Sequence, residues 1–245
     1  MTQIVESLQL HPVVPNVIGF WVLILALCAL IYLVPKFLFR KPLPLRLKYL
    51  FSPFDWIWIP FVELGRPPWW RKKWLERSGV IEGAAVLEEG FGFGTSPLIA
   101  ARMVGPKGKL YALDVAPVHV AVLRVRAKLY RLRNLEVILA DAKCTGLPDK
   151  SVDVVFMCYA FHHFWDKEGT LKELHRVLRE DGTLSMLEDR VDETKKAVKL
   201  AEESGLFHLL EQDGKFCRFR RTGREAWSKV SILTSYVQHG ARRSR

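Results

Sequence analysis

The sequence has few cysteines, and they are scattered. Its 245 residues contain Cys28, Cys144, Cys158 and Cys217, with no C-x-x-C pair among them. A disulfide framework or a structural zinc site needs several cysteines at short, regular spacings. The sequence therefore predicts a protein of a reducing compartment without a bound metal.

Two nucleotide-binding fingerprints are missing as well, although a glycine turn is present. Residues 86–96 read VLEEGFGFGTS, an apolar run followed by glycines at every second position. The dinucleotide fingerprint G-x-G-x-x-G fails, because its third glycine would fall on Thr95 or Pro97. A P-loop fails because no Gly-Lys-Ser/Thr follows. A nicotinamide-dependent dehydrogenase is thus disfavoured. The pattern predicts a strand, a tight turn and a helix capped by Thr95 or Ser96.

Charge is absent from residues 13–34, and Lys and Arg are absent from the first twelve residues. At ~1.5 Å per residue the uncharged run reaches about 33 Å, enough for a bilayer core of ~30 Å. A cleaved signal peptide fits less well, because there is neither a basic start nor an A-x-A site. A buried core helix is the other alternative. We predict a single membrane-spanning helix over residues 13–35. Residues 1–12 would lie outside the cytoplasm, and the Lys- and Arg-rich remainder, with the catalytic domain, inside it.

Basic residues concentrate in two flanking segments. The net charge is +11, yet residues 36–77 carry ten Lys/Arg against three Asp/Glu, and residues 215–245 carry nine against one. The middle of the chain is therefore mildly acidic. This argues against a nucleic-acid partner, since such domains carry positive charge on the fold. Residues 36–78 are also rich in Trp and Phe, which indicates an interfacial, juxtamembrane segment. Packing of these aromatics on the folded domain is the alternative. Residues 222–245 are predicted to be a basic tail.

Strand and helix patterns alternate over residues 79–221, the predicted catalytic domain. The alternation predicts an α/β, Rossmann-like fold with a seven-stranded, mostly parallel sheet, an antiparallel last strand and helices on both faces. Strands are expected at residues 84–89, 109–114, 135–140, 152–158, 183–188, 206–211 and 215–221. Helices are expected at residues 68–77, 97–104, 117–131, 167–179 and 192–204. Asp181 and Gly182 predict a turn before the fifth strand.

Three carboxylates, Glu88, Asp114 and Asp141, lie at the ends of the first three predicted strands. Because parallel strands end at one edge of a sheet, where ligands bind in such folds, these side chains are expected to share a site. Glu88 would meet an ammonium group, Asp114 a ribose and Asp141 an exocyclic amine. A ligand that has all three groups and no phosphate fits better than a dinucleotide.

On these residues, the stretch from Gly83 to Asp189 resembles the class I S-adenosylmethionine-dependent methyltransferases, and most of all their quinone and phospholipid methyltransferase branch. The likeness is carried by the glycine turn, by LDV at 113–115, by DA at 141–142 and by YAFHHF at 159–164. It implies S-adenosylmethionine as cofactor. The residues implied to bind it are Glu88, Gly90, Gly92, Gly94, Asp114, Val115, Asp141, Ala142 and Tyr159. The bulky Phe91 and Phe93 are expected to narrow the pocket.

Methyl transfer from a sulfonium mainly requires positioning, and a general base is needed only if the acceptor loses a proton. Tyr159, His162 and His163 are the candidate catalytic residues. The predicted function is methyl transfer to a lipid or isoprenoid-quinone-like acceptor by a membrane-anchored enzyme. A tethered methyltransferase for a soluble small molecule or protein, and a non-catalytic cofactor-binding membrane scaffold, are the alternatives. No sequence feature sets the oligomeric state.

Overall fold

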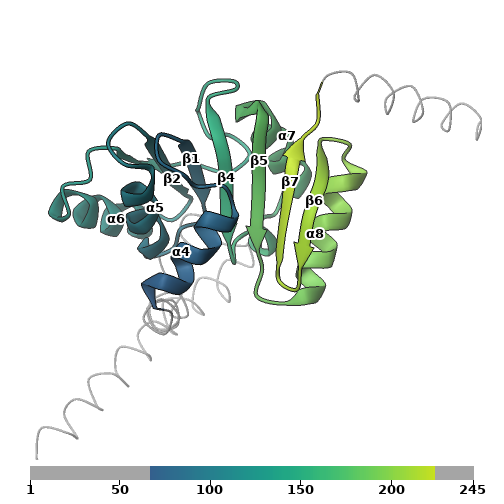
Figure 1. The fold of residues 1–245 in the computed structure, drawn as a ribbon, viewed down its shortest axis with the longest axis horizontal. Coiled ribbons are helices and arrows are strands. Elements are labelled where there is room, and N and C mark those ends of the chain that lie inside the picture. Colours follow the sequence, from purple (N-terminus) through teal and green to yellow (C-terminus); the bar gives the residue numbers. More distant parts are fainter. Residues whose placement is uncertain (1–66, 224–245) are drawn as a thin grey trace, which may run out of the picture. The chain divides into compact units, whose positions relative to one another are not determined.

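A seven-stranded sheet organises the part of the chain that the structure, a computed structural model, describes, namely residues 67–223 (Figure 1). The strands are β1 (Ala85–Glu89), β2 (Lys109–Asp114), β3 (Leu135–Leu139), β4 (Val152–Cys158), β5 (Leu178–Leu187), β6 (Phe207–Asp213) and β7 (Phe216–Arg221). The helices are α4 (Pro68–Arg77), α5 (Thr95–Val104), α6 (Pro117–Leu129), α7 (Lys167–Val177), α8 (Val191–Glu203) and the short 3-10 turn η2 (Phe161–His163).

The strand order is β3-β2-β1-β4-β5-β7-β6. Neighbouring strands from β3 to β5 pair in parallel, and β7 runs antiparallel to both β5 and β6. Strands β2 and β3 are added on one side of β1, whereas β4 and the later strands are added on its other side. The strand order therefore changes direction at β1, which β2 and β4 flank. Such a reversal places a crevice outside the carboxyl ends of the strands. The predicted Rossmann-like fold is confirmed, including its antiparallel last strand.

The sheet is buried on both faces. One face packs against α7 and α8 around Leu174, Val198 and Met186. The other packs against α4 and α5 around Leu75, Val104 and Phe156, and a smaller cluster lies under α6. Figure 1 shows α4 and α5 in front of the sheet, with α7 and α8 on the other side. Burial on both faces explains why the central strands read as nearly continuous apolar runs.

Helix α4 contains the part of the aromatic segment that the structure describes. Trp74 packs on Phe216 with ring centroids 5.3 Å apart, and the guanidinium of Arg77 lies 4.7 Å from the Phe216 ring. Trp70 stacks on Tyr159, whereas Trp69 is 69% exposed. For Trp70 and Trp74, packing on the domain is the better interpretation. The remainder of the segment, residues 36–66, lies outside the described residues.

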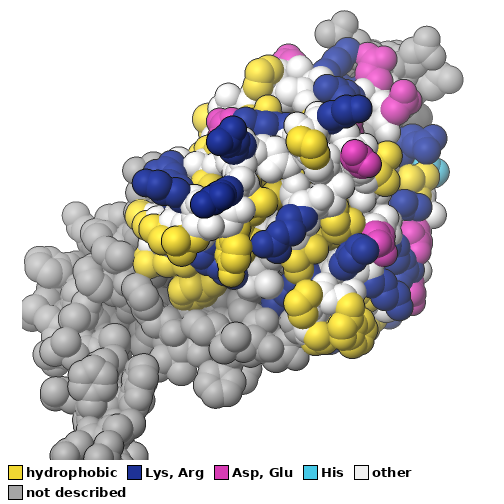
Figure 2. Space-filling model, turned by 60° about the vertical axis from the view of Figure 1, so that its left-hand side comes forward, with side chains coloured by type: hydrophobic (Ala, Val, Ile, Leu, Met, Phe, Trp, Pro, Cys, Tyr) yellow, Lys and Arg dark blue, Asp and Glu magenta, His cyan; other side chains and the backbone are white. Residues whose placement is uncertain are grey.

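Helix α6 carries two strongly exposed apolar side chains. Its sheet-facing residues include Val120 and Leu123, but Val125 and Leu129 are 60% and 73% exposed. Figure 2 brings this side of the molecule forward and shows hydrophobic side chains interleaved with Lys and Arg.

Two local predictions are wrong. The predicted turn at Asp181 and Gly182 lies within β5, where the pairing with β4 breaks register between Val152 and Val154. The turn signal marks a bulge rather than a strand start. The helix after the glycine turn begins at Thr95, with Gly94 in the left-handed conformation (φ 81°) at the N-cap and no side-chain capping bond. Left-handed backbone at Gly94 replaces the expected hydroxyl cap.

The predicted single-pass membrane localisation requires correction. Among residues 67–223, no helix is both long and apolar enough to cross a bilayer. The segment 13–35, on which the prediction was placed, lies outside the described residues, as do residues 1–12 and the tail beyond residue 223.

Candidate cofactor and acceptor site

The glycine turn, residues 90–94, directly follows β1. Gly90, Gly92 and Gly94 all have positive φ, at 70°, 57° and 81°. Side chains are disfavoured in this conformation, which glycine adopts freely. The Gly90 N–H donates to the carbonyl of Leu113 at 2.9 Å, and a Cβ built on Gly90 would lie 2.5 Å from the Cβ of Ala160. The turn is therefore fixed against the loop that follows β4.

The two phenylalanines of the turn take different places. Phe91 is 4% exposed and packs in the core cluster with Leu98, Val120 and Leu123. The expectation that its ring narrows the pocket is wrong, because the ring lies in the core under the turn. Phe93 is half-buried and packs against the ring of His119, with centroids 5.2 Å apart.

Asp114, at the end of β2, is bound to the glycine turn. Its Oδ2 accepts from the N–H of Gly92 at 3.1 Å, and its Oδ1 accepts from the N–H of Ala116 at 2.8 Å. The Nδ1 of His119 lies 3.2 Å from Oδ2. Asp114 is 6% exposed, so its orientation is set by these bonds. The structure thus joins two motifs, 22 residues apart, that the sequence analysis assigned to one ligand.

The remaining residues assigned to the cofactor differ in exposure. Glu88 is 2% exposed, and Ala142 is also buried. Val115 is half-buried, and Asp141 is exposed, with its Oδ1 accepting from the N–H of Lys143. All lie at the ends of adjacent strands and so at one edge of the sheet. Their direct contact with the cofactor remains a prediction.

Tyr159 begins the loop after β4 in a left-handed conformation, with φ 57°. A tyrosine seldom adopts this backbone, and surrounding structure must stabilise it. Its N–H donates to the carbonyl of Leu187 at 2.7 Å, and its ring stacks on Trp70, with centroids 6.5 Å apart. Tyr159 thus connects α4 to the edge of the sheet.

The two adjacent histidines differ. His162 is half-buried, and its Nδ1 lies 2.5 Å from Oε2 of Glu188, which follows β5 and is 1% exposed. The hydrogen bond to Glu188 raises the pKa of His162, and burial opposes this effect. His163 is exposed, and its ring lies 3.9 Å from that of His162. Of the two, His162 therefore has the buried carboxylate partner that orients a general base.

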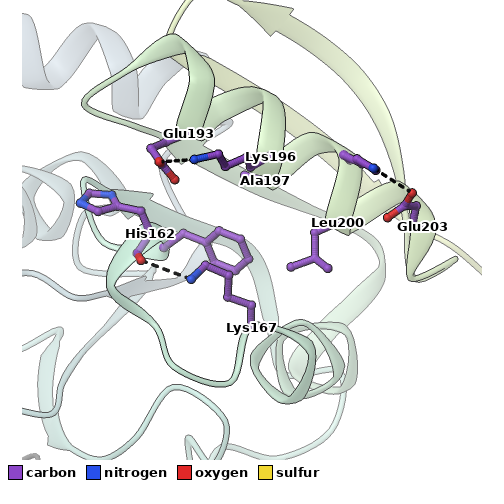
Figure 3. Close-up of a pocket in the computed structure, with 9 residues that line it drawn as sticks. His162, Lys167, Glu193, Lys196, Ala197, Leu200 and Glu203 are labelled. Carbon is purple, nitrogen blue, oxygen red and sulfur yellow. Dashed lines mark hydrogen bonds and ion pairs between the residues drawn. The ribbon is translucent and has the colours of Figure 1, made fainter.

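His162 also lines a cavity of about 460 Å³ between η2 and α8. Figure 3 shows Lys167 below it, with its Nζ bound to the carbonyl oxygen of His162. Along α8, Lys196 pairs with Glu193 and Lys199 with Glu203. Phe161 and Leu200 supply apolar surface. The cavity is therefore lined by both apolar and charged side chains.

Three residues of this edge were missed from the sequence: Glu188, Glu89 and His119. Glu188 ends a predicted strand, so the strand-end rule that found Asp114 could have found it. Glu89 is adjacent to Glu88, and in a strand such neighbours point to opposite faces. Because both faces of this sheet are covered, Glu89 is fully buried, and Glu88 is only 2% exposed. His119 lies in the first turn of α6, five residues after Asp114, where a helix can return a side chain to the strand end.

Comparison with known proteins places this geometry in a class. Residues 86–182 match the family model described as methyltransferase domain. A ubiquinone/menaquinone biosynthesis C-methyltransferase of Hahella chejuensis is 33% identical over 120 residues, which cover 49% of this chain and 48% of that protein. A demethylmenaquinone methyltransferase of Lactobacillus johnsonii is 32% identical over 147 residues, covering 58% and 59%. The chain thus spans about half the length of the curated relatives it matches.

A solved methyltransferase structure has a similar fold. The S-adenosylmethionine-dependent methyltransferase from Aquifex aeolicus superposes with a TM-score of 0.58 at 26% identity, covering 74% of this chain and 98% of that one. The site also fits the cofactor chemically, because carboxylates at the strand ends suit an ammonium and ribose hydroxyls and would repel a diphosphate. The described part of the chain thus has the fold of an S-adenosylmethionine-dependent methyltransferase, and residues 86–182 match a methyltransferase domain.

Proposed function

We propose that this protein transfers a methyl group from S-adenosylmethionine to a ring carbon of a quinol, the reduced form of an isoprenoid-quinone-like lipid. The observation that carries the proposal is the His162–Glu188 pair. His162 lies in the loop after β4, and Ala160 of the same loop meets Gly90 of the glycine turn. Relatives described as a ubiquinone/menaquinone biosynthesis C-methyltransferase and a demethylmenaquinone methyltransferase support the acceptor class. A ring carbon becomes a stronger nucleophile when a neighbouring hydroxyl loses its proton, so such an acceptor needs a base.

His162 is suited to take that proton. The carboxylate of Glu188 can only accept hydrogen bonds, so Nδ1 carries the hydrogen and Nε2 has the free lone pair. Glu188 also stabilises the imidazolium that forms when Nε2 receives the hydroxyl proton. S-adenosylmethionine, when bound, supplies the methyl group on a sulfonium that is already a good leaving group. The new carbon–carbon bond forms as the sulfur–carbon bond breaks, and the ring then loses its displaced hydrogen as a proton.

The residues at the ends of the first three strands would bind the cofactor. Glu88 would pair with the ammonium group and Asp114 with the ribose, while Asp141 would accept from the adenine amine. The three glycines let the turn approach the methionine part closely. Holding the two reactants in line is the main contribution of the chain, because the leaving group needs no further activation.

The proposal is tested by incubating the full chain with methyl-labelled cofactor and three acceptors: a reduced demethylquinone with a short isoprenoid chain, a soluble catechol and a protein extract. We expect label in the quinone ring. His162→Ala should lower kcat about 10²- to 10⁴-fold, the range for removal of a general base. His163→Ala, which alters the exposed neighbour, is the matched control and should retain most activity. Label only in the catechol or in protein would overturn the proposed acceptor.

A further inference from the structure

His119 is a buried polar residue that the proposed chemistry leaves unused. It is 4% exposed and lies in the first turn of α6, directly after the strand that ends in Asp114. Its Nδ1 is 3.2 Å from Oδ2 of Asp114. Its Nε2 is buried and has no hydrogen-bond partner within the part of the chain described here. A purely space-filling role would not explain a polar ring here, because an apolar side chain would fill the space without an unpartnered nitrogen.

The contact with Asp114 explains the polar ring. Because a carboxylate only accepts, Nδ1 must be the donor. Oδ2 then receives two bonds, from His119 and from the N–H of Gly92, whereas Oδ1 receives only that of Ala116 within the described residues. Each carboxylate oxygen offers about two acceptor sites. Oδ2 is therefore filled, and the acceptor site that remains for a ligand hydroxyl is on Oδ1.

The ring of His119 is itself held in place. Phe93 of the glycine turn packs against it, with an angle of 56° between the rings. The guanidinium of Arg126, two turns further along α6, donates to the carbonyl of Phe93. Helix α6 thus binds the turn at Phe93 and the strand end at Asp114. This arrangement also gives Phe93 a packing role in the glycine turn.

We propose that His119 is a positioning residue for cofactor binding. By donating to Oδ2, it fixes the Asp114 carboxylate so that Oδ1 faces one ribose hydroxyl of S-adenosylmethionine. The inference rests on the assignment of the ribose to Asp114, and it is independent of which acceptor is methylated. It predicts that His119 affects cofactor affinity and leaves the rate at saturating cofactor nearly unchanged.

The test compares His119→Asn with His119→Gln and His119→Leu. The amide nitrogen of Asn can take the place of Nδ1, whereas that of Gln reaches towards Nε2. Calorimetric titration with S-adenosylhomocysteine should give a Kd raised roughly 10- to 100-fold for the Leu and Gln variants, as expected for loss of a hydrogen bond to a charged group. The Asn variant should stay within about threefold of wild type. Thermal unfolding of each variant shows that it is folded, and the Asn variant remains informative if Leu fails to fold.

Analogues that lack one ribose hydroxyl separate positioning from simple packing. In wild type, the 2′-deoxy or the 3′-deoxy form of S-adenosylhomocysteine should bind at least about tenfold more weakly. In His119→Leu, removal of the same hydroxyl should matter less than about threefold, because Asp114 no longer holds it. Equal losses in both proteins, or a weak Asn variant, would overturn the inference. Failure of quinone methylation with these binding results intact would overturn only the proposed acceptor, whereas a wild type that binds no nucleoside would overturn both.

Discussion

A Cβ on Gly90 would lie 2.5 Å from the Cβ of Ala160, a separation that real Cβ atoms do not adopt. This contact joins the turn after β1 to the loop after β4, and thereby the predicted cofactor turn to the loop that carries His162. Gly90 must be glycine for two reasons, its φ of 70° and the absence of space for a side chain.

Gly90→Ala separates these two reasons when it is compared with Gly146→Ala. Gly146 has a similar φ of 73°, but a Cβ at this position would meet nothing within 4 Å. Gly146→Ala should therefore cost only the left-handed penalty of about 1–2 kcal/mol, whereas Gly90→Ala should cost about 2–5 kcal/mol because the clash adds to it. Urea unfolding measures both. Equal destabilisation would show that the loop after β4 moves aside without cost.

Glu89→Gln should stabilise the protein in a pH-dependent way. Burial, reinforced by the charges of Glu173 and Asp141, raises the pKa of Glu89 well above its usual value. Below the unfolded pKa of about 4.3, the carboxyl is protonated in both states and costs nothing extra. As the pH rises through the raised folded pKa, the ionised form destabilises the native state. The variant should therefore have a higher thermal unfolding midpoint than wild type at pH 8 and nearly the same midpoint at pH 4. Glu136→Gln, at an exposed position, should show no such trend.

Glu173→Gln should show the opposite pH dependence. The hydrogen bond from Arg176 lowers the pKa of Glu173 to about 2, although burial opposes this effect, and Thr145 donates to it as well. Stability from Glu173 is fully present above its unfolded pKa of about 4.3 and is lost as pH falls through about 2. The variant should therefore be less stable than wild type at pH 7, with the difference disappearing near pH 2. A difference that persists at pH 2 would assign the effect to packing.

Glu188→Gln should change the pH profile of catalysis. The hydrogen bond to Glu188 raises the pKa of His162. A base must be unprotonated, so kcat/KM is expected to rise as the pH passes upward through that raised pKa. In Glu188→Gln the midpoint should move to lower pH, because the carboxylate no longer favours the imidazolium, and the plateau should fall. An unchanged midpoint would mean that a different group titrates.

The local pattern of the chain was sufficient for much of the fold. The alternation of apolar strands with amphipathic helices predicted the seven-stranded sheet. Buried strands are visible in the sequence as apolar runs, and amphipathic helices as apolar residues at a helical period. Strand-end position alone predicted that Glu88, Asp114 and Asp141 lie at one edge. The turn predicted at Gly182 was wrong, because strand pairing in the sheet overrides a local turn preference and absorbs it as a bulge.

What the sequence determined by itself is the order of elements, the glycine turn and the edge of the sheet at which the cofactor site is predicted. What only the tertiary structure decided is which side chains act together there. Glu188 reaches His162 across 26 residues, and His119 and Phe93 meet although they lie on different elements. Such partners are chosen by strand order and by which face of the sheet a side chain enters, and both depend on the packing of the whole domain.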